Sequence, residues 1–558
     1  MALHAPAAQI EQPLSNQQPV SLDQRARRAV LGSLALVMLL ASLDSTVVGT
    51  ALPQIVSDLQ GNDIYAWVFT IYLLTMTVSM PMYAAISDRI GRTPVLFFGV
   101  ALFLAASALC GLSTEMWQLV LFRGIQGLGA GALAPVVVAI VGDLFSPADR
   151  ARYQPLLGSV FLFAFLIGPT VGGVLTDSVG WHWVFYINLP LGLFALFVIW
   201  RVMPRLKPVG TRHHFDVLGV VLFALAVVPI LLGLRNLPDG GWTDPAVGGL
   251  MLLGAAFAAL FLVAEFRAAE PIIPVRMFRN PTFAVGSIVI LLAVAGLFVS
   301  IVYMPRYFQF VRGATATESG WQLMALLVGV VFGAVMGGQI AARTGHWKLL
   351  LLVMMGIGVA GMVLLAGLTP DVEPALVWAS MFMAGFGVGP VTSLLTAVIQ
   401  SSVAPELIGA VSGTVTFFRQ FGASLWLAIS GTVFATVFRD ELPGRLAGRG
   451  VPDELAGAFG SQMGGSSDEL TTLGDLGATI LAALPPELRA LVEPVIGAVV
   501  GGIHEAFSAA IGSTFWIGIV AVGAAIVVLA FLREVPFPKE EPGSAVSTAG
   551  EQPVASTA

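Results

Sequence analysis

Charged residues and cysteine are both scarce in this chain of 558 residues. Asp, Glu, Lys and Arg make up 11% of it, against ~25% in soluble domains, so it has too little polar surface to cover a water-soluble fold. The single cysteine, Cys110, excludes a disulfide framework and any multi-cysteine metal site. The formal net charge of −6 argues against a nucleic-acid-binding protein.

Hydrophobic residues, by contrast, make up 57% of the chain and recur in long runs from end to end. A helix that crosses a bilayer needs ~20 mostly apolar residues. Fourteen stretches meet this length: 29–51, 65–87, 93–113, 117–142, 153–175, 183–203, 216–235, 245–266, 282–305, 318–342, 347–368, 374–400, 408–437 and 509–533. The first is too long for the core of a signal peptide. The sequence therefore predicts an all-α, multi-pass membrane protein.

Lys and Arg residues predict the orientation, because cytoplasmic loops of membrane proteins are enriched in them. With the N-terminus inside, the inner segments hold 18 of the 27 basic residues and the outer segments hold seven. The remaining two, Arg123 and Arg419, lie inside predicted spans. We therefore expect a protein of the cytoplasmic membrane with both termini in the cytoplasm.

A nine-residue segment recurs 254 residues further along the chain. Ala84–Arg92 (AAISDRIGR) joins the second and third spans, and Gly338–His346 (GQIAARTGH) joins the tenth and eleventh. Both loops fall on the predicted inner side, which predicts two parallel bundles of six helices. Spans 7 and 8 then form an inserted pair between the bundles.

These patterns divide the chain into bundles, linkers and tails. We expect a disordered tail at 1–28, the N-terminal six-helix bundle at 29–203, the inserted helices with their linkers at 204–281, the C-terminal six-helix bundle at 282–533, and a second disordered tail at 534–558. The segment 438–508 is expected to form an outer loop, with short amphipathic helices in its second half from Leu470 to Phe507. A fifteenth span near 488–503 is the competing interpretation, which the charged residues around it disfavour.

Five short motifs follow one another along the N-terminal half. They are Leu43–Val48 running to Ala51–Pro53, Asp88–Arg92, Arg123 with Gln126, Gly127 and Gly129, Gly168–Gly173, and Trp181–Gly192. In this order they resemble the major facilitator superfamily, and within it the 14-span drug:proton antiporters similar to the EmrB and QacA multidrug exporters. Ala84, Thr93 and His182 depart mildly from the family's pattern and leave the expected fold unchanged.

The resemblance implies a proton-driven exporter that moves amphipathic, cationic or lipophilic compounds by alternating access. Such a protein needs no cofactor beyond the proton gradient, works as a monomer in the membrane and contributes to antibiotic resistance. Export of a native lipid or lipid-linked molecule is the alternative. An enzyme is disfavoured because the six histidines are scattered over tails and loops, and ATP drive because no phosphate-binding Gly-Lys-Ser/Thr loop occurs.

Three ionisable residues inside predicted spans are candidates for proton coupling. Counting the helix rise of ~1.5 Å per residue places Asp44, Arg123 and Arg419 at similar depths. An ionisable group in hydrocarbon is costly and therefore usually functional. Burial favours the neutral form of a carboxyl group and a nearby arginine favours the charged form, so a shift of partner can move a proton. We expect Asp44 to carry the proton, with Arg123 and Arg419 as alternating counter-charges; a static buried ion pair is the alternative.

Two further motifs are expected to serve the conformational change. Ion pairs between two inner loops could latch that face closed, through Asp88, Arg89, Gly91, Arg92, Asp143 and Arg150. The antiporter signature in span 5 comprises Gly168, Pro169, Gly172 and Gly173. Because proline removes a helix hydrogen bond and glycine permits close helix approach, this segment is expected to bend where the two halves meet. Solvated positive-inside loops and ordinary small-residue packing are the respective alternatives.

The substrate cavity of such a transporter is expected near the midplane, between the two bundles. Candidate lining residues are Trp67, Tyr72, Gln126, Asn188, Tyr303 and Phe417. Tryptophans near span ends, namely Trp181, Trp183 and Trp242, are instead expected in the interfacial belts.

Overall fold

The computed structural model describes residues 24–59, 67–203, 216–237, 241–268, 271–404, 407–452, 477, 489 and 492–534. These residues are helical almost throughout and include no strand. The structure places 24–28 in the first helix rather than in the tail. Residues 1–23 and 535–558 of the predicted tails, and about half of the predicted outer loop, lie outside the described residues.

The helices fall into three groups along the chain. The first comprises α1 (Gln24–Leu59), α2 (Trp67–Ile90), α3 (Arg92–Gly111), α4 (Met116–Leu144), α5 (Pro147–Val179), α6 (His182–Tyr186) and α7 (Asn188–Val202). The second comprises α8 (Val217–Asn236), η1 (Pro245–Gly249), α9 (Leu250–Arg267) and η2 (Val275–Arg279). The third comprises α10 (Pro281–Arg306), η3 (Tyr307–Val311), α11 (Ala316–Thr344), α12 (Trp347–Ala366), α13 (Pro374–Ser401), α14 (Ile408–Gly448), η6 (Glu493–Val495) and α18 (Ile496–Ala530).

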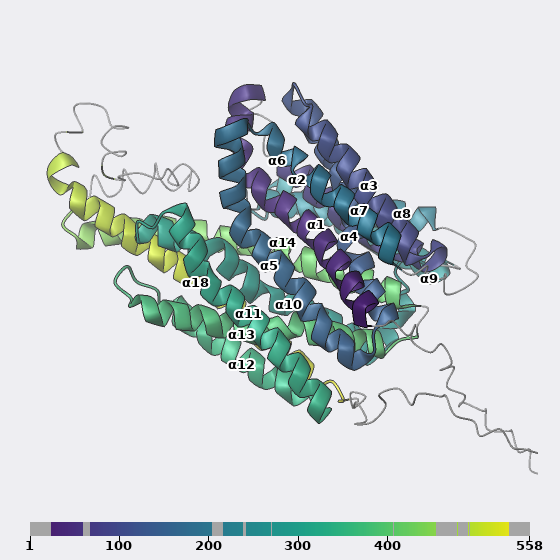
Figure 1. Ribbon diagram of the computed structural model, residues 1–558. Coiled ribbons are helices and arrows are strands. Elements are labelled where there is room, and N and C mark those ends of the chain that lie inside the picture. Colours follow the sequence, from purple (N-terminus) through teal and green to yellow (C-terminus); the bar gives the residue numbers. More distant parts are fainter. Residues whose placement is uncertain are drawn as a thin grey trace, which may run out of the picture.

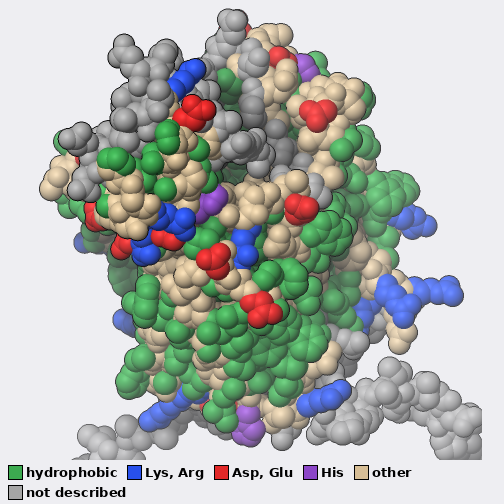
Figure 2. Space-filling view, turned by 90° about the vertical axis from the view of Figure 1, so that its left-hand side faces the viewer, with side chains coloured by type: hydrophobic (Ala, Val, Ile, Leu, Met, Phe, Trp, Pro, Cys, Tyr) green, Lys and Arg blue, Asp and Glu red, His purple; other side chains and the backbone are tan. Residues whose placement is uncertain are grey.

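Thirteen candidate membrane spans, each helical and long and apolar enough to cross a bilayer, lie in the described part of the chain. α5, at 33 residues, has the length of a further span, which gives the fourteen that the sequence predicts. Large apolar side chains face outward: Leu252 is 74% exposed and Trp200 is 72% exposed, as expected where the solvent is lipid. Figure 2 shows a broad apolar area on one face, with basic side chains along its lower edge and acidic ones above it.

The first and third groups form two bundles with equivalent packing. α4 packs on α2 and α3, as α13 packs on α11 and α12; α1 packs on α5 and α7, as α10 packs on α14 and α18. The bundles meet where α2 packs on α14 and where α5 packs on α11. Because the repeat relates α2 to α11 and α5 to α14, these two contacts are equivalent. Figure 1 shows the bundles meeting toward the lower right, where the chain enters α1, and diverging toward the upper left.

The inserted helices α8 and α9 pack on each other and cover the line where α2 and α14 meet. The ring of Phe223 on α8 lies 5.1 Å from that of Phe417 on α14. The guanidinium of Arg235 lies 5.5 Å from the ring centre of Trp67 on α2. The pair is therefore bound to both bundles at once.

The ends of the predicted outer loop differ from expectation. α14 continues as one helix of 41 residues to Gly448, and α18 begins at Ile496 and runs for 35 residues. Residues 496–507 are thus the start of the last span-forming helix rather than a separate amphipathic helix. Arg449 and Glu505, which suggest a loop by their charge, pair at 2.7 Å between these two helical extensions.

Candidate functional site

Asp44 of α1 is held by three side chains from two other helices. Its Oδ2 accepts a hydrogen bond from Nη1 of Arg123 at 2.7 Å. Its Oδ1 accepts from Nε2 of Gln126 and from Nδ2 of Asn188, both at 2.9 Å. The Asp44 and Arg123 side chains are both 0% exposed. Because a buried ion is costly unless it is paired, the contact between this acid and this base offsets part of the cost of burying each.

Arg123 makes further contacts that fix it in the bundle core. Its Nε donates to the backbone carbonyl of Val68 at 3.3 Å, and its Nη1 also donates to Oε1 of Gln126 at 2.7 Å. Its guanidinium carbon lies 4.0 Å from the ring centre of Tyr72, a cation–π contact. Nη2 has no hydrogen-bond acceptor among the described residues. Both N–H groups of this nitrogen are therefore unused within the described part of the chain.

The residues predicted to line a substrate cavity fall in three different places. Tyr72, Gln126 and Asn188 are at most 1% exposed and surround the Asp44–Arg123 pair. Trp67 and Phe417 pack against the inserted helices. Tyr303 lies in the core of the C-terminal bundle, its ring 5.5 Å from that of Phe434. The structure does not bring the six together, and a cavity lined by them stays a prediction.

Arg419 lies on α14, in the other bundle from Asp44. The partners of Asp44 all belong to the N-terminal bundle, so Arg419 does not share its charge in this conformation. Arg419 is partly buried and forms no ion pair with another described residue. Its predicted role as an alternating counter-charge therefore requires a second conformation.

Four of the predicted latch residues come together at the end where the chain enters α1, namely Asp88, Gly91, Arg92 and Asp143. Arg92 at the start of α3 pairs with Asp88 at the end of α2, and its Nε donates to Asp143 at 2.8 Å. Asp88 also reaches the other bundle, where its Oδ2 accepts the backbone N–H of Ala410 at 2.9 Å. Ala410 lies in the first turn of α14, so this carboxylate caps the positive end of that helix.

Glycines make this close approach possible. Gly91 has a φ of 101°, which lets the chain turn sharply between α2 and α3; its counterpart in the repeat, Gly345, has a φ of 78°. Gly409 lies directly against the ion network. A Cβ at that position would collide with Oδ1 of Asp88 and Nη1 of Arg92. The missing side chain is therefore a requirement of the contact between the bundles.

Arg150, another predicted latch residue, forms its hydrogen bond outside this network. From the first turn of α5, Nε of Arg150 donates to the backbone carbonyl of Phe145 at 2.8 Å, in the connection that precedes the helix. The neighbouring Asp149 pairs with Arg27 of α1 at 3.3 Å. Arg89 is partly exposed beside the network. Arg150 thus orders the loop between α4 and α5.

A glutamine pair that the sequence analysis missed also joins the bundles. Nε2 of Gln154 on α5 donates to Oε1 of Gln400 on α13 at 3.0 Å. Nε2 of Gln400 donates in turn to Oγ of Ser412 at 2.9 Å and to the carbonyl of Val138 at 3.3 Å. Gln400 is 1% exposed. A polar amide at the end of a predicted span was the available signal.

The antiporter signature packs α5 against the helix that carries Asp44. A Cβ at Gly168 would collide with Oγ1 of Thr46, and that hydroxyl donates to the carbonyl of Ala164 at 3.2 Å. Gly173 has open space around it, and the carbonyl of Gly172 accepts from Thr176. The side chain of Pro169 lies outside the described residues. One glycine of the signature therefore fixes the position of α1.

The buried cluster around Asp44 also includes the one cysteine of the sequence. The thiol of Cys110 lies 3.6 Å from Oε1 of Gln126 and is fully buried. Among the described residues there is no group of three or more His, Cys, Asp or Glu that could hold a metal ion.

Comparison with known proteins agrees with this architecture. The profile of the Major Facilitator Superfamily matches residues 34–427. "Multidrug resistance protein 3" of Bacillus subtilis is 33% identical over 515 residues, covering 91% of this chain and 96% of that protein. "Multidrug transporter protein MdtP" of the same organism is 34% identical over 411 residues, covering 74% and 76%. The structure of the human organic anion transporter MFSD10 matches with a TM-score of 0.55 and 13% identity, covering 89% of this chain and 99% of that one.

Proposed function

This chain belongs to the Major Facilitator Superfamily, a family of transporters rather than enzymes, and from that premise we propose that it exports amphipathic drug-like compounds in exchange for protons. The relatives named as multidrug transporters support drug export. The proposal assigns proton coupling to Asp44 and takes cationic or lipophilic compounds as the substrate class. The chain is a multi-pass membrane protein, and the proton gradient is the energy source.

The observation that carries this proposal is the buried Asp44–Arg123 pair. Protonation of Asp44 removes its attraction to Arg123, which for unit charges ~4 Å apart at an effective dielectric constant of ~20 is about 4 kcal/mol. Since ~1.4 kcal/mol corresponds to a factor of ten, protonation shifts the equilibrium between this conformation and one in which the two side chains are apart by roughly a thousandfold. The Arg123 Nη2 donor, which has no acceptor among the described residues, is available for a new contact once Asp44 is neutral.

The contacts between the bundles relate the protonation of Asp44 to the conformation of the whole molecule. Asp88 and Gln400 close the bundles at the end where the chain enters α1, and the bundles diverge at the opposite end. With the termini in the cytoplasm, as the basic residues predict, this is the conformation open to the outside. Substrate leaves and a proton enters in this state. The latch opens when the bundles rock to the inward-open state.

The proposal is tested by uphill export from proteoliposomes with an imposed proton gradient and a cationic dye. We expect Asp44→Asn to abolish gradient-driven export while the protein still inserts and folds. Asp58→Asn is the matched control, since it removes a carboxylate from the exposed end of the same helix and should leave export intact. Gradient-driven export retained by Asp44→Asn would refute the assignment.

The same proteoliposomes test the alternative substrate class, a native lipid or lipid-linked molecule. Wild-type protein that moves a fluorescent lipid between leaflets under a proton gradient, and moves none of a panel of dyes, would replace drug export by lipid export. Loss of that lipid movement in Asp44→Asn would keep the proton site and change only the cargo.

A further inference from the structure

Two carboxylates of the inserted helices lie side by side with unused oxygens. Asp216 caps the start of α8, where its Oδ1 accepts the N–H of Gly219 at 2.7 Å. Glu265, in the last turn of α9, is 3% exposed, and its Oε1 accepts the N–H of Ile272 at 3.2 Å. Oδ2 of Asp216 and Oε2 of Glu265 are buried and have no hydrogen-bond donor among the described residues. The Glu265 carboxylate also has a backbone partner in Ile273. A buried carboxylate oxygen without a donor is costly, so Asp216 is the acid that calls for a cationic donor.

The two acids lie close to each other. A Cβ placed on Gly219 would lie 2.8 Å from Cγ of Asp216 and 2.9 Å from Oε1 of Glu265. The carboxylates therefore face each other across the first turn of α8. Neither forms an ion pair with another described residue in this structure.

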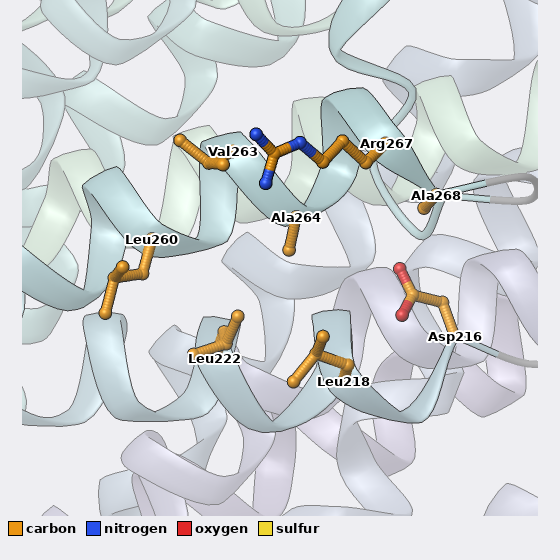
Figure 3. A pocket seen from close by; sticks show the side chains of 8 residues that line it. All are labelled: Asp216, Leu218, Leu222, Leu260, Val263, Ala264, Arg267 and Ala268. Atoms are coloured by element: carbon orange, nitrogen blue, oxygen red, sulfur yellow. The ribbon is translucent and has the colours of Figure 1, made fainter.

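A groove between α8 and α9 leads to Asp216, whereas Glu265 is not among the residues that line it. The groove has a volume of about 420 Å³. In Figure 3, Leu218 and Leu222 of α8 point toward Leu260 of α9, while Asp216 lies at one end and Arg267 along the upper edge. Leu218 is 62% exposed and Leu260 is 54% exposed, so the groove opens to the surface that faces lipid. It thus combines an apolar wall, an anion-binding guanidinium and a cation-binding carboxylate.

The groove runs from the membrane interface into the apolar layer. α8 begins, and α9 ends, at the same end of the molecule as the latch, and each helix is long enough to cross the bilayer. Asp216 and Arg267 therefore lie at headgroup level, and the leucines lie deeper. This order of charged and apolar groups is that of a phospholipid standing in its own leaflet.

We propose that this groove binds a phospholipid with a primary-amine headgroup, of which phosphatidylethanolamine is the simplest. The lipid phosphate pairs with the guanidinium of Arg267. The ammonium, with three N–H donors, pairs with the carboxylate of Asp216, the acid that lines the groove. One acyl chain lies along the leucines. This lipid is a resident ligand and not the exported cargo, so the proposal stands apart from the proposed function.

Binding here is connected to the boundary between the bundles. Phe223, which follows the groove residue Leu222, packs on Phe417 of α14. α14 carries the latch contact at its first turn. An occupied groove therefore supports the helix pair that covers the α2–α14 boundary.

Native mass spectrometry of the full chain, released from detergent after equilibration with equal amounts of two lipids, tests the proposal. We expect about a tenfold preference for phosphatidylethanolamine over phosphatidylcholine of the same acyl chains, the effect of one charge-assisted hydrogen bond. The trimethylated ammonium of phosphatidylcholine has no N–H to donate. Phosphatidylglycerol, which lacks an ammonium, should also bind more weakly than phosphatidylethanolamine.

Three variants separate the roles of the two charges. Asp216→Asn retains a helix-capping side chain and removes the negative charge, so it should lose the headgroup preference while lipid still binds. Arg267→Gln should weaken all three lipids alike. Arg201→Gln, which changes an exposed arginine in the last turn of α7, is the matched control and should behave as wild type. A wild type without preference, a preference for phosphatidylglycerol, or an unchanged preference in Asp216→Asn would each overturn the proposal.

Discussion

A single methyl group at Gly409 should open the latch without removing any charge. The Cβ of Gly409→Ala would occupy space now filled by Oδ1 of Asp88 and Nη1 of Arg92. One of these groups must move, and the hydrogen bond from the Ala410 N–H to Asp88, 2.9 Å long, is the contact most directly lost. Because the rest of α14 continues unchanged, the effect is confined to the boundary between the bundles.

The magnitude follows from that hydrogen bond. A hydrogen bond to a charged group contributes about 1.5–3 kcal/mol. Its loss from the latched state alone changes the ratio of open to latched molecules by roughly 10–150-fold. Gly444→Ala, on the same helix with no atom within 4 Å of the added Cβ, is the control and should leave the ratio unchanged.

The assay is the rate at which a water-soluble maleimide labels a reporter cysteine near the latch. Ser412→Cys is suitable because Ser412 is 0% exposed and lies on the α14 face that contacts Gln400. The only native cysteine, Cys110, is 0% exposed, and a Cys110→Ser background removes it. We expect faster labelling in Gly409→Ala by the factor given above. An unchanged labelling rate would refute the view that this contact holds the bundles together.

Two further predictions concern the packing of α5. Gly168→Ala should lower the melting temperature of the purified protein, since overpacking against Thr46 costs ~1–3 kcal/mol, whereas Gly173→Ala, with open space around it, should not; equal melting temperatures would contradict the packing described. A double-mutant cycle of Gln154→Leu and Gln400→Leu, read by the same labelling rate, should give a coupling of about 0.5–1.5 kcal/mol, and additive effects would show that their 3.0 Å hydrogen bond does not contribute to closure.

The sequence predicted the depth of the charged groups but not their partners. Counting residues along the spans puts Asp44 and Arg123 at one level, and the structure joins them at 2.7 Å. Gln126 and Asn188 were expected along a cavity, yet they hydrogen-bond to Asp44. Depth follows from the rise of a helix, whereas the direction of a side chain depends on how the helix is rotated against its neighbours.

The contact between the bundles had a weaker sequence signal. The repeat at Asp88–Arg92 locates one side of the latch. The other side is the backbone N–H of Ala410, a group that every residue except proline carries, so no motif marks it. The predicted bounds of the outer loop were wrong for another reason. Charged residues such as Glu505 suggest the end of a span, whereas a helix can continue unbroken into water and pair its charges there.

The central claim is that Asp44 couples export to protons, and substrate-triggered proton movement tests it most directly. A cationic dye added to wild-type proteoliposomes without a proton gradient should drive protons against the direction of dye movement. Asp44→Asn should still bind the dye but move no protons, while Asp58→Asn should behave as wild type. Equal proton movement in wild type and Asp44→Asn would contradict the account, because the proton would then pass through another group.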